Sequence, residues 1–236
     1  MKRLLTLALL PLLTIGTAQA TLIDRGGGLI YDDVLNITWL QDANHGAGTT
    51  YDNGSSATDG RMTWDNAVAW SANLSYGGYD DWRLPTMTDT GTPGCDFSYN
   101  GTDCGYNVQT TAGATVYSEM ASMWDDTLGN TPTYDTNGNP QAGGLTSTSA
   151  DGVTIDNLIS YTYWSGLEYA PDTSYAWGFR TVNGDQGYGG KDNQFHAWAV
   201  RSGDSLSAVP IPAAVWLFGT GLIGLIGLGR CRRRDG

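Results

Sequence analysis

Two polar segments of the chain, 166–174 and 183–194, hold the side chains best suited to bind a ligand. They mix carboxylates, amides and tyrosines with glycines, and they lie next to stretches that alternate as strands do. Loops between consecutive strands present such side chains on a rigid scaffold, so we expect a binding site there. The candidate ligand-binding residues are Glu168, Tyr169, Asp172, Asp185, Tyr188, Asp192 and Asn193. Ordinary solvated turns are the alternative interpretation.

The same oxygen-rich loops could hold Ca²⁺, which prefers carboxylate, amide and carbonyl ligands. Segment 135–139 has the aspartate, asparagine and glycine of a calcium loop but lacks a closing glutamate at the right distance. We therefore expect no required cofactor. Ca²⁺ is an optional ligand, and the sequence does not identify residues that would bind it.

The histidines and the motifs of known enzyme classes do not favour catalysis. His45 and His196 are the only histidines, and neither belongs to an H-E-x-x-H motif or accompanies a G-x-S-x-G serine. We expect His196, in a strand beside Trp198, to be packed or exposed at an edge rather than catalytic. The many aspartates leave a glycosidase with paired carboxylates as an open alternative. The expectation is a protein that is not an enzyme.

Segment 80–86 could bind sugar, because it sets a carboxylate pair beside an indole and a guanidinium. The favoured interpretation is structural, with Trp82 and Leu84 in the core and Arg83 paired to a carboxylate. This structural motif comprises Asp81, Trp82, Arg83, Leu84 and Pro85.

Charge and cysteine content narrow the class of partner. Between residues 21 and 208 the chain has six basic and 23 acidic residues, a net charge of −17. Such a surface repels nucleic acid and anionic polysaccharide unless cations bridge them. Cys95 and Cys104 are the only cysteines in this region and are expected to form a disulfide that pins a glycine-rich loop. A metal site there would need more ligands nearby.

Both ends of the chain predict export. Lys2 and Arg3, an apolar stretch and a small-residue motif at Ala18 and Ala20 form a signal peptide over residues 1–20, cut after Ala20 by signal peptidase. Residues 209–228 carry no charge, and 20 helical residues just cross a bilayer core of roughly 30 Å. Because arginines follow this span, the domain before it is expected outside the inner membrane. The alternative is that residues 209–228 form an ordinary C-terminal membrane anchor that is not cleaved.

The tail, residues 205–236, also resembles the PEP-CTERM sorting signal of Gram-negative bacteria that make exopolysaccharide. Val209, Pro210 and Pro212 carry the resemblance, together with the apolar run and the arginines. Ile211 stands where the family name implies a glutamate. The resemblance implies an exosortase as a partner, an inner-membrane precursor, and final residence at the cell surface or in the extracellular matrix.

The pattern between the two ends predicts an α+β domain over residues 21–204. Short strands open it, and helices are expected from Thr63 to Gly77 and over 115–128. Residues 161–165, 175–180 and 195–201 read as strands of an antiparallel sheet. Long irregular loops fill the remainder.

A string of landmarks in this domain resembles the DUF1566 family, named also for the C-terminal domain of the Legionella collagen-like adhesin. Its most specific part is the Asp-Trp-Arg-Leu-Pro-Thr run of residues 81–86. The resemblance implies a C-type-lectin-like fold and a surface protein. The adhesin's binding of sulfated glycosaminoglycans is not expected here because the domain is acidic. The triplets by which calcium-dependent lectins hold sugar are also missing.

These features together predict an exported module that binds glycan or exopolysaccharide and is not an enzyme. A structural protein of the polysaccharide matrix, without a discrete ligand, is the first alternative. An enzyme on a lectin-like fold is the second, weakened because such enzymes use reactive cysteines.

Overall fold

The computed structural model describes residues 21–95, 98–112, 115–116 and 118–205. The predicted signal peptide, the sorting motif and the apolar segment 209–228 lie outside these residues. Within the described ranges, no helix has the length and apolar character needed to cross a membrane.

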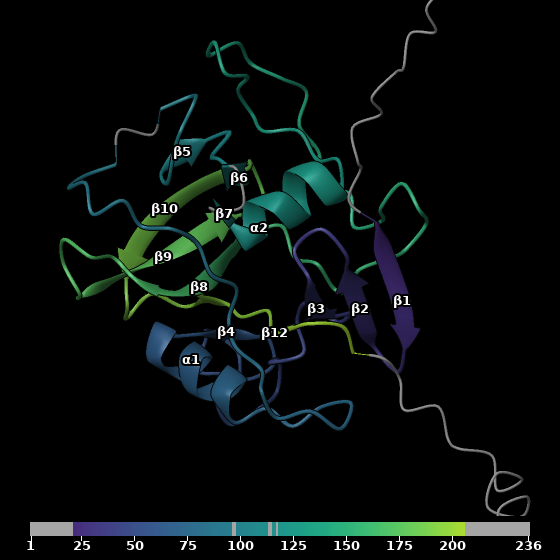
Figure 1. The fold of residues 1–236 in the computed structure, drawn as a ribbon. Coiled ribbons are helices and arrows are strands. Elements are labelled where there is room, and N and C mark those ends of the chain that lie inside the picture. The colour runs from purple at the N-terminus through teal and green to yellow at the C-terminus, as the bar shows by residue number, and fades with distance from the viewer. Residues whose placement is uncertain (1–20, 96–97, 113–114, 117, 206–236) are drawn as a thin grey trace, which may run out of the picture.

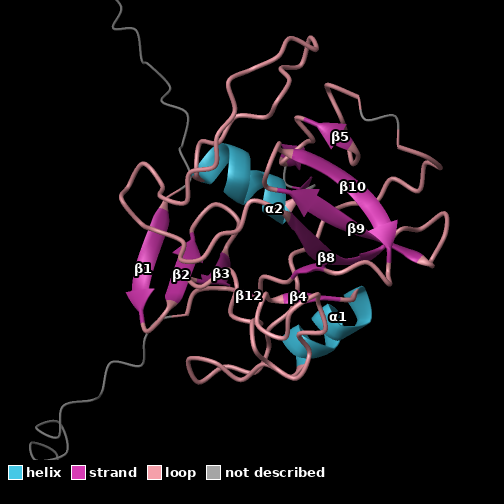
Figure 2. Cartoon of the chain, turned by 180° about the vertical axis from the view of Figure 1, so that it is seen from behind, coloured by secondary structure: helices cyan, strands magenta, loops and turns pink. Residues whose placement is uncertain are grey.

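Two sheets lie on opposite sides of the molecule (Figures 1 and 2). The smaller has four antiparallel strands in the order β1-β2-β3-β12. Its two central strands, β2 and β3, are almost wholly buried. Its strands are β1 (Leu22–Gly26), β2 (Leu29–Asp32), β3 (Ile37–Leu40) and β12 (Val200–Ser202).

The larger sheet has six strands in the order β4-β11-β8-β9-β10-β5. Its centre is the antiparallel meander β8-β9-β10, and β11 joins β8 in parallel at His196 and Tyr163. Its strands are β4 (Arg61–Met62), β5 (Gly105–Tyr106), β8 (Thr162–Glu168), β9 (Tyr175–Arg180), β10 (Asp185–Gly190) and β11 (Phe195–His196). A separate hairpin pairs β6 (Thr111–Ala112) with β7 (Thr115–Val116).

Two helical segments accompany the sheets. Helix α1 (Trp64–Ala72) follows Thr63, as the sequence predicts, but its predicted end at Gly77 is wrong, because the helix already ends at Asn73. Helix α2 (Glu119–Ala121) continues into a π-helical stretch η1 (Ser122–Thr127). The predicted α+β class is therefore confirmed.

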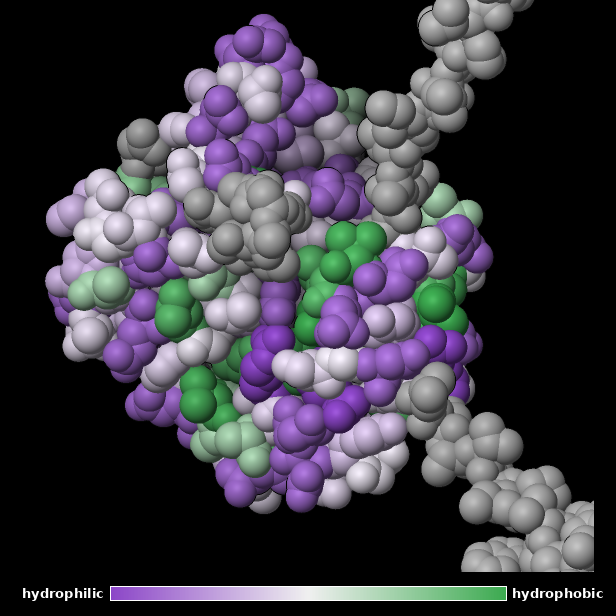
Figure 3. Space-filling model, viewed as in Figure 1, coloured by the Kyte–Doolittle hydropathy of each residue, from purple (hydrophilic) through white to green (hydrophobic). Residues whose placement is uncertain are grey.

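Tryptophans form the centre of the core. All eight within the described ranges are at most 9 % exposed, so the aromatic content does build a packed interior. Trp198 contacts both sheets. Its ring centre lies 4.4 Å from that of Trp39 in β3 and 6.3 Å from that of Tyr163 in β8, and its Nε1 donates to the Leu40 carbonyl. In Figure 3, hydrophilic residues cover most of the visible surface and hydrophobic residues occupy smaller, separate areas.

The structure corrects the predicted strand at 195–201. This segment is not one strand but contains β11, which belongs to the larger sheet, and the start of β12, which belongs to the smaller one. The three residues between them, Ala197 to Ala199, are fully buried and carry Trp198 into the space between the sheets. A local alternation of small and aromatic residues could not reveal this change of sheet.

The predicted helix over 115–128 is also wrong in its first turn, because 115–116 belongs to β7 and the helix begins at Glu119. Ser118 caps it by accepting a hydrogen bond from the Ala121 amide, and the Glu119 amide donates to the Thr86 carbonyl. A capping serine marks the start of a helix more strongly than the apolar spacing upstream of it.

The predicted loop at 183–194 contains a strand. Residues 185–190 pair with Arg180 to Tyr175 along their whole length as β10. Three glycines in this strand hide the alternation by which a strand is recognised. The true loops are the turn before Asp185 and the segment Lys191 to Gln194.

The predicted disulfide between Cys95 and Cys104 is present, with 5.6 Å between the two Cα atoms. It closes the loop that runs along the outer edge of β10 towards β5.

Candidate functional site

An open groove lies where the end of β10, the start of β9 and the first turn of α1 meet. Its volume is about 610 Å³. We call it the loop-face groove, and its lining residues are Thr63, Asp65, Ser174, Tyr175, Gly190, Lys191 and Asp192. Three segments far apart in the sequence thus contribute to one hollow.

Lys191 connects the segments that line the groove. Its ammonium lies 4.3 Å from the centre of the Trp64 ring and pairs with the Glu168 carboxylate. Its backbone amide donates to the Ser174 carbonyl at 3.1 Å, and its carbonyl accepts from the Trp64 amide at 3.0 Å. These contacts tie both strand ends to the helix, so the groove is preformed.

The walls offer both acidic and aromatic groups. Within the described part of the chain, the exposed carboxylates of Asp65 and Asp192 have no hydrogen-bond or ion-pair partner. Asp172 is already engaged, because the hydroxyl and amide of Ser174 bind its carboxylate and lower its pKa. Tyr175 is 38 % exposed and leaves part of its ring open to a ligand.

The predicted site residues divide into two groups. Asp192 lines the groove, Glu168 reaches it through Lys191, and Asp172 is exposed in the turn that leads to Ser174. Asn193 is exposed directly after Asp192. Of these four residues Asp192 alone lines the groove, and the other three lie in the segments that adjoin it.

The prediction that Tyr169 and Asp185 are accessible is wrong, because they are 4 % and 1 % exposed. Tyr169 stacks on Tyr188 with ring centres 3.9 Å apart. Asp185 begins β10, at the end far from the groove, and its carboxylate pairs with Arg180 at 2.5 Å. Burial raises the pKa of Asp185, and the Arg180 charge opposes that rise. Both residues support the sheet, and Tyr188 serves as a stacking partner.

Sequence reasoning missed Thr63, Asp65, Tyr175 and Lys191 as site residues. Tyr175 stands in register with Trp177 and Phe179, so the alternation predicted a buried ring. It is the first residue of β9, where the sheet ends, and its side chain is exposed. The position of Asp65 beside β10 depends on how α1 packs, which no local pattern reports.

The structural interpretation of the Asp81 to Pro85 motif is confirmed. Trp82 and Leu84 are each 3 % exposed. Arg83 pairs with Glu119, and Asp81 pairs with Arg201 on β12.

The remaining candidates also have structural roles. The Asp135 carboxylate accepts hydrogen bonds from Asn137 and Asn139, which close a turn and lower its pKa. Burial lowers the pKa of His196 to about 4, and its ring contacts Asn44. Among the residues that the structure describes, no three His, Cys, Asp or Glu side chains are grouped to hold a metal ion.

Comparison with known proteins supports the resemblance found in the sequence. The family model of the Lcl C-terminal domain matches residues 28–201. No curated protein and no solved structure matches the chain. The matched segment covers most of the chain and contains the groove, both helical segments and the Asp81 to Pro85 motif. The chain therefore belongs to the Lcl C-terminal domain family.

Proposed function

We propose that this chain is an exported surface module that binds a neutral glycan in the loop-face groove. The observation that carries the proposal is the joining of an exposed Tyr175 ring and two unpaired carboxylates, Asp65 and Asp192, around one preformed hollow. Membership of the Lcl C-terminal domain family supports an adhesin-like module.

The chemistry of the groove suits a sugar. An aromatic face packs against the C–H groups of a pyranose ring, while carboxylates and hydroxyls accept and donate hydrogen bonds to its hydroxyl groups. Lys191 is the one cation in the lining and is already paired with Glu168. The groove is therefore acidic, which favours a neutral glycan over a sulfated or uronic one.

Ca²⁺ enters the proposal as an accessory ion. Asp65 and Asp192 are two hard oxygen ligands, whereas Ca²⁺ takes six to eight. Glycan hydroxyls and water would have to complete the shell. Binding is proposed to persist without Ca²⁺ and to strengthen in its presence.

Catalysis is not the role that we propose for this groove. The groove contains no histidine or cysteine among its lining residues, and the buried His196 is engaged with Asn44. Paired carboxylates hydrolyse glycosides, and the groove presents Asp65 and Asp192, so product analysis belongs in the test.

Export and sorting complete the proposed function. We propose cleavage by signal peptidase after Ala20, membrane insertion of 209–228, and recognition of Val209, Pro210 and Pro212 by an exosortase. Delivery to the surface or matrix would bring the groove to extracellular polysaccharide. A C-type-lectin-like classification of the fold is part of the same proposal.

The test is an array of neutral glycans that includes the host's own exopolysaccharide, probed with the full chain in mild detergent. Each array is run with Ca²⁺ and with a chelator. Tyr175→Ala and the double variant Asp65→Asn/Asp192→Asn should each weaken binding at least tenfold. Tyr161→Ala is the matched control, because Tyr161 is 39 % exposed and does not line the groove.

No binding by the folded wild type overturns the glycan proposal and favours a structural matrix protein. Equal loss with Tyr161→Ala also overturns the assignment of the groove. Shortened glycan products that depend on Asp65 and Asp192 would identify an enzyme instead.

A further inference from the structure

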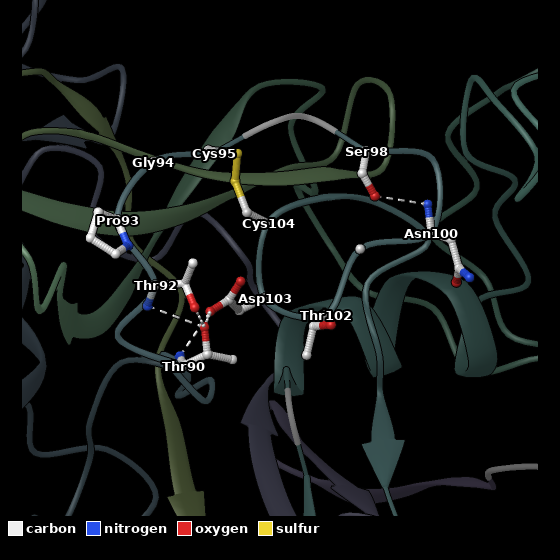
Figure 4. Close-up of a pocket in the computed structure, with 11 residues that line it drawn as sticks. Thr90, Thr92, Pro93, Gly94, Cys95, Ser98, Asn100, Thr102, Asp103 and Cys104 are labelled. Atoms are coloured by element: carbon white, nitrogen blue, oxygen red, sulfur yellow. Dashed lines mark hydrogen bonds between the residues drawn. A yellow bond between two sulfur atoms is a disulfide. The ribbon is translucent and has the colours of Figure 1, made fainter.

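A second hollow lies on the loop closed by the disulfide. Its volume is about 610 Å³, and Figure 4 shows residues that line it. We call it the disulfide-loop groove. Its lining residues are Thr90, Thr92, Pro93, Gly94, Cys95, Ser98, Asn100, Gly101, Thr102, Asp103 and Cys104. None of them lines the loop-face groove.

The first wall, residues 90–95, is anchored to the aromatic cluster beneath it. The Asp89 carboxylate accepts hydrogen bonds from the Trp177 indole at 2.8 Å and from the Ala170 amide at 2.7 Å. The Gly94 amide donates to the Tyr169 hydroxyl at 2.6 Å. This wall therefore rests on buried groups of the larger sheet.

The second wall, residues 98–104, is anchored separately at the edge of β10. The side-chain amide of Gln186 donates to the Asp103 carbonyl at 2.7 Å. The Tyr106 amide donates to the Ser98 carbonyl at 2.8 Å, and Gly101 donates to the Tyr106 carbonyl at 3.0 Å. A Cβ at Gly101 would lie 2.2 Å from the Cys104 carbonyl, so only glycine fits this turn.

Two links join the walls to each other. One is the Cys95–Cys104 disulfide. The other is the Asp103 carboxylate, which accepts hydrogen bonds from the Thr90 amide at 2.8 Å and hydroxyl at 2.5 Å (Figure 4). The covalent link fixes the spacing of the two walls at Cys95, because the hydrogen bond of the neighbouring Gly94 holds the first wall to Tyr169 and not to the second wall. The shape of the hollow therefore depends on the disulfide.

The groups that face this hollow are uncharged hydroxyls and amides, apart from Asp103. Asn100 and Thr102 are exposed, and among the described residues their side chains bond to no other group. With no cation in the lining, the hollow offers nothing to a sulfate or carboxylate. Hydroxyl and amide groups that donate and accept at once match the hydroxyls of a neutral sugar.

We propose that the disulfide-loop groove is a second binding site for a neutral oligosaccharide, and that the Cys95–Cys104 disulfide keeps it competent to bind. The inference shares its ligand class with the proposed function but rests on different residues. Dithiothreitol would transfer two electrons and two protons to the disulfide, giving two thiols and the cyclic oxidised reagent. The second wall would then lose its covalent link to the first at Cys95.

The experiment follows ligand protection by hydrogen–deuterium exchange and mass spectrometry on the full chain in mild detergent. The probes are cellohexaose, maltohexaose and mannohexaose. Slower exchange is expected in peptides that cover residues 90–104 with at least one probe. The double variant Asn100→Ala/Thr102→Val should abolish this protection, and so should Cys95→Ser/Cys104→Ser. Thr58→Val, an exposed threonine outside both grooves, should preserve it.

The two sites fail in different ways. Tyr175→Ala should remove protection at residues 172–192 and keep it at 90–104. Protection confined to 172–192 with every probe overturns the second site and leaves the proposed function standing. Protection confined to residues 90–104 overturns the proposed function and leaves the second site standing. Protection at 90–104 that survives reduction, shown by free thiols at both Cys95 and Cys104, overturns the role given to the disulfide.

Discussion

The guanidinium of Arg83 holds the carboxylate of Glu119 through two parallel hydrogen bonds, Nη1 to Oε2 at 2.7 Å and Nη2 to Oε1 at 2.8 Å. The Thr86 amide donates to the same carboxylate at 2.8 Å. Glu119 is 5 % exposed and is the first residue of α2. This pair therefore fastens the Asp81 to Pro85 motif to the second helical segment.

Glu119→Ala is expected to lower the free energy of unfolding by about 3 kcal/mol, because it leaves the Arg83 charge and the Thr86 amide without their partner. Arg83→Lys should also destabilise, since an ammonium cannot form the paired bonds. Denaturant unfolding measures both. Glu168→Ala, which breaks the more exposed pair with Lys191, should cost less than about 1 kcal/mol. Equal costs for Glu119 and Glu168 would contradict a special role for the Arg83 pair.

Trp82→Ala is expected to destabilise the fold by about 3–5 kcal/mol, because the ring is 3 % exposed and its removal leaves a large cavity. Thermal and denaturant unfolding check this value. Tyr161→Ala, at an exposed ring, is the comparison and should change stability little. An equally stable Trp82→Ala protein would place this side chain outside the core.

Reduction of the Cys95–Cys104 disulfide is expected to lower the melting temperature by several degrees. Opening the cross-link, whose cysteines are nine residues apart, returns conformational entropy to the unfolded chain, a term of roughly 2–3 kcal/mol. Calorimetry with and without reductant measures the shift, and thiol titration confirms the state of each sample. Free thiols at both Cys95 and Cys104 in the native, oxidised preparation would contradict the bond.

Stability is expected to fall as the pH drops from about 6.5 to about 4 because of His196. Burial chiefly, and then the Arg61 charge, lower its pKa to about 4, so the folded state stays neutral where the unfolded state binds a proton. As the pH falls, the unfolded state therefore binds a proton before the folded state does. Acid thus shifts the folding equilibrium toward the unfolded state. His196→Gln should flatten this part of the pH profile. His45→Gln, at a half-buried histidine, is the control, and an unchanged profile in His196→Gln would refute the assignment.

Asp125 should make stability depend on pH in the opposite direction to His196. Burial, assisted by the charge of Asp126, raises the pKa of Asp125 to about 8. Between its ordinary pKa of 3.8 and about 8 the folded state holds a proton that the unfolded state releases, so stability falls as the pH rises. Asp125→Asn should be more stable than wild type at pH 8 by several kcal/mol, with little difference near pH 4.

Asp126→Asn is the matched control for Asp125, since Asp126 is exposed in the same π-helical stretch. It should give a much smaller gain at pH 8. A less stable Asp125→Asn protein at that pH would show that the carboxylate is ionised and paired in the folded state.

Particular residues show how far the sequence could predict the fold. The alternation of Trp177 and Phe179 predicted β9, and Thr63 marked the start of α1, because both signals act over a few neighbouring residues. The Arg83 pair was predicted without its partner. Glu119 lies 36 residues away, and no spacing rule connects the two. The glycines of β10 concealed a strand that only its pairing with β9 reveals.

The sequence by itself determined the class of the protein: an acidic α+β domain of the Lcl C-terminal family, with a tryptophan core and one disulfide. Those features follow from composition, local periodicity and a family motif. Only the tertiary structure decided that Asp65, Tyr175 and Asp192 meet in one groove while Asp185 is buried at the other end of β10. The physical reason is that burial and proximity arise when distant segments pack, and packing depends on the whole chain.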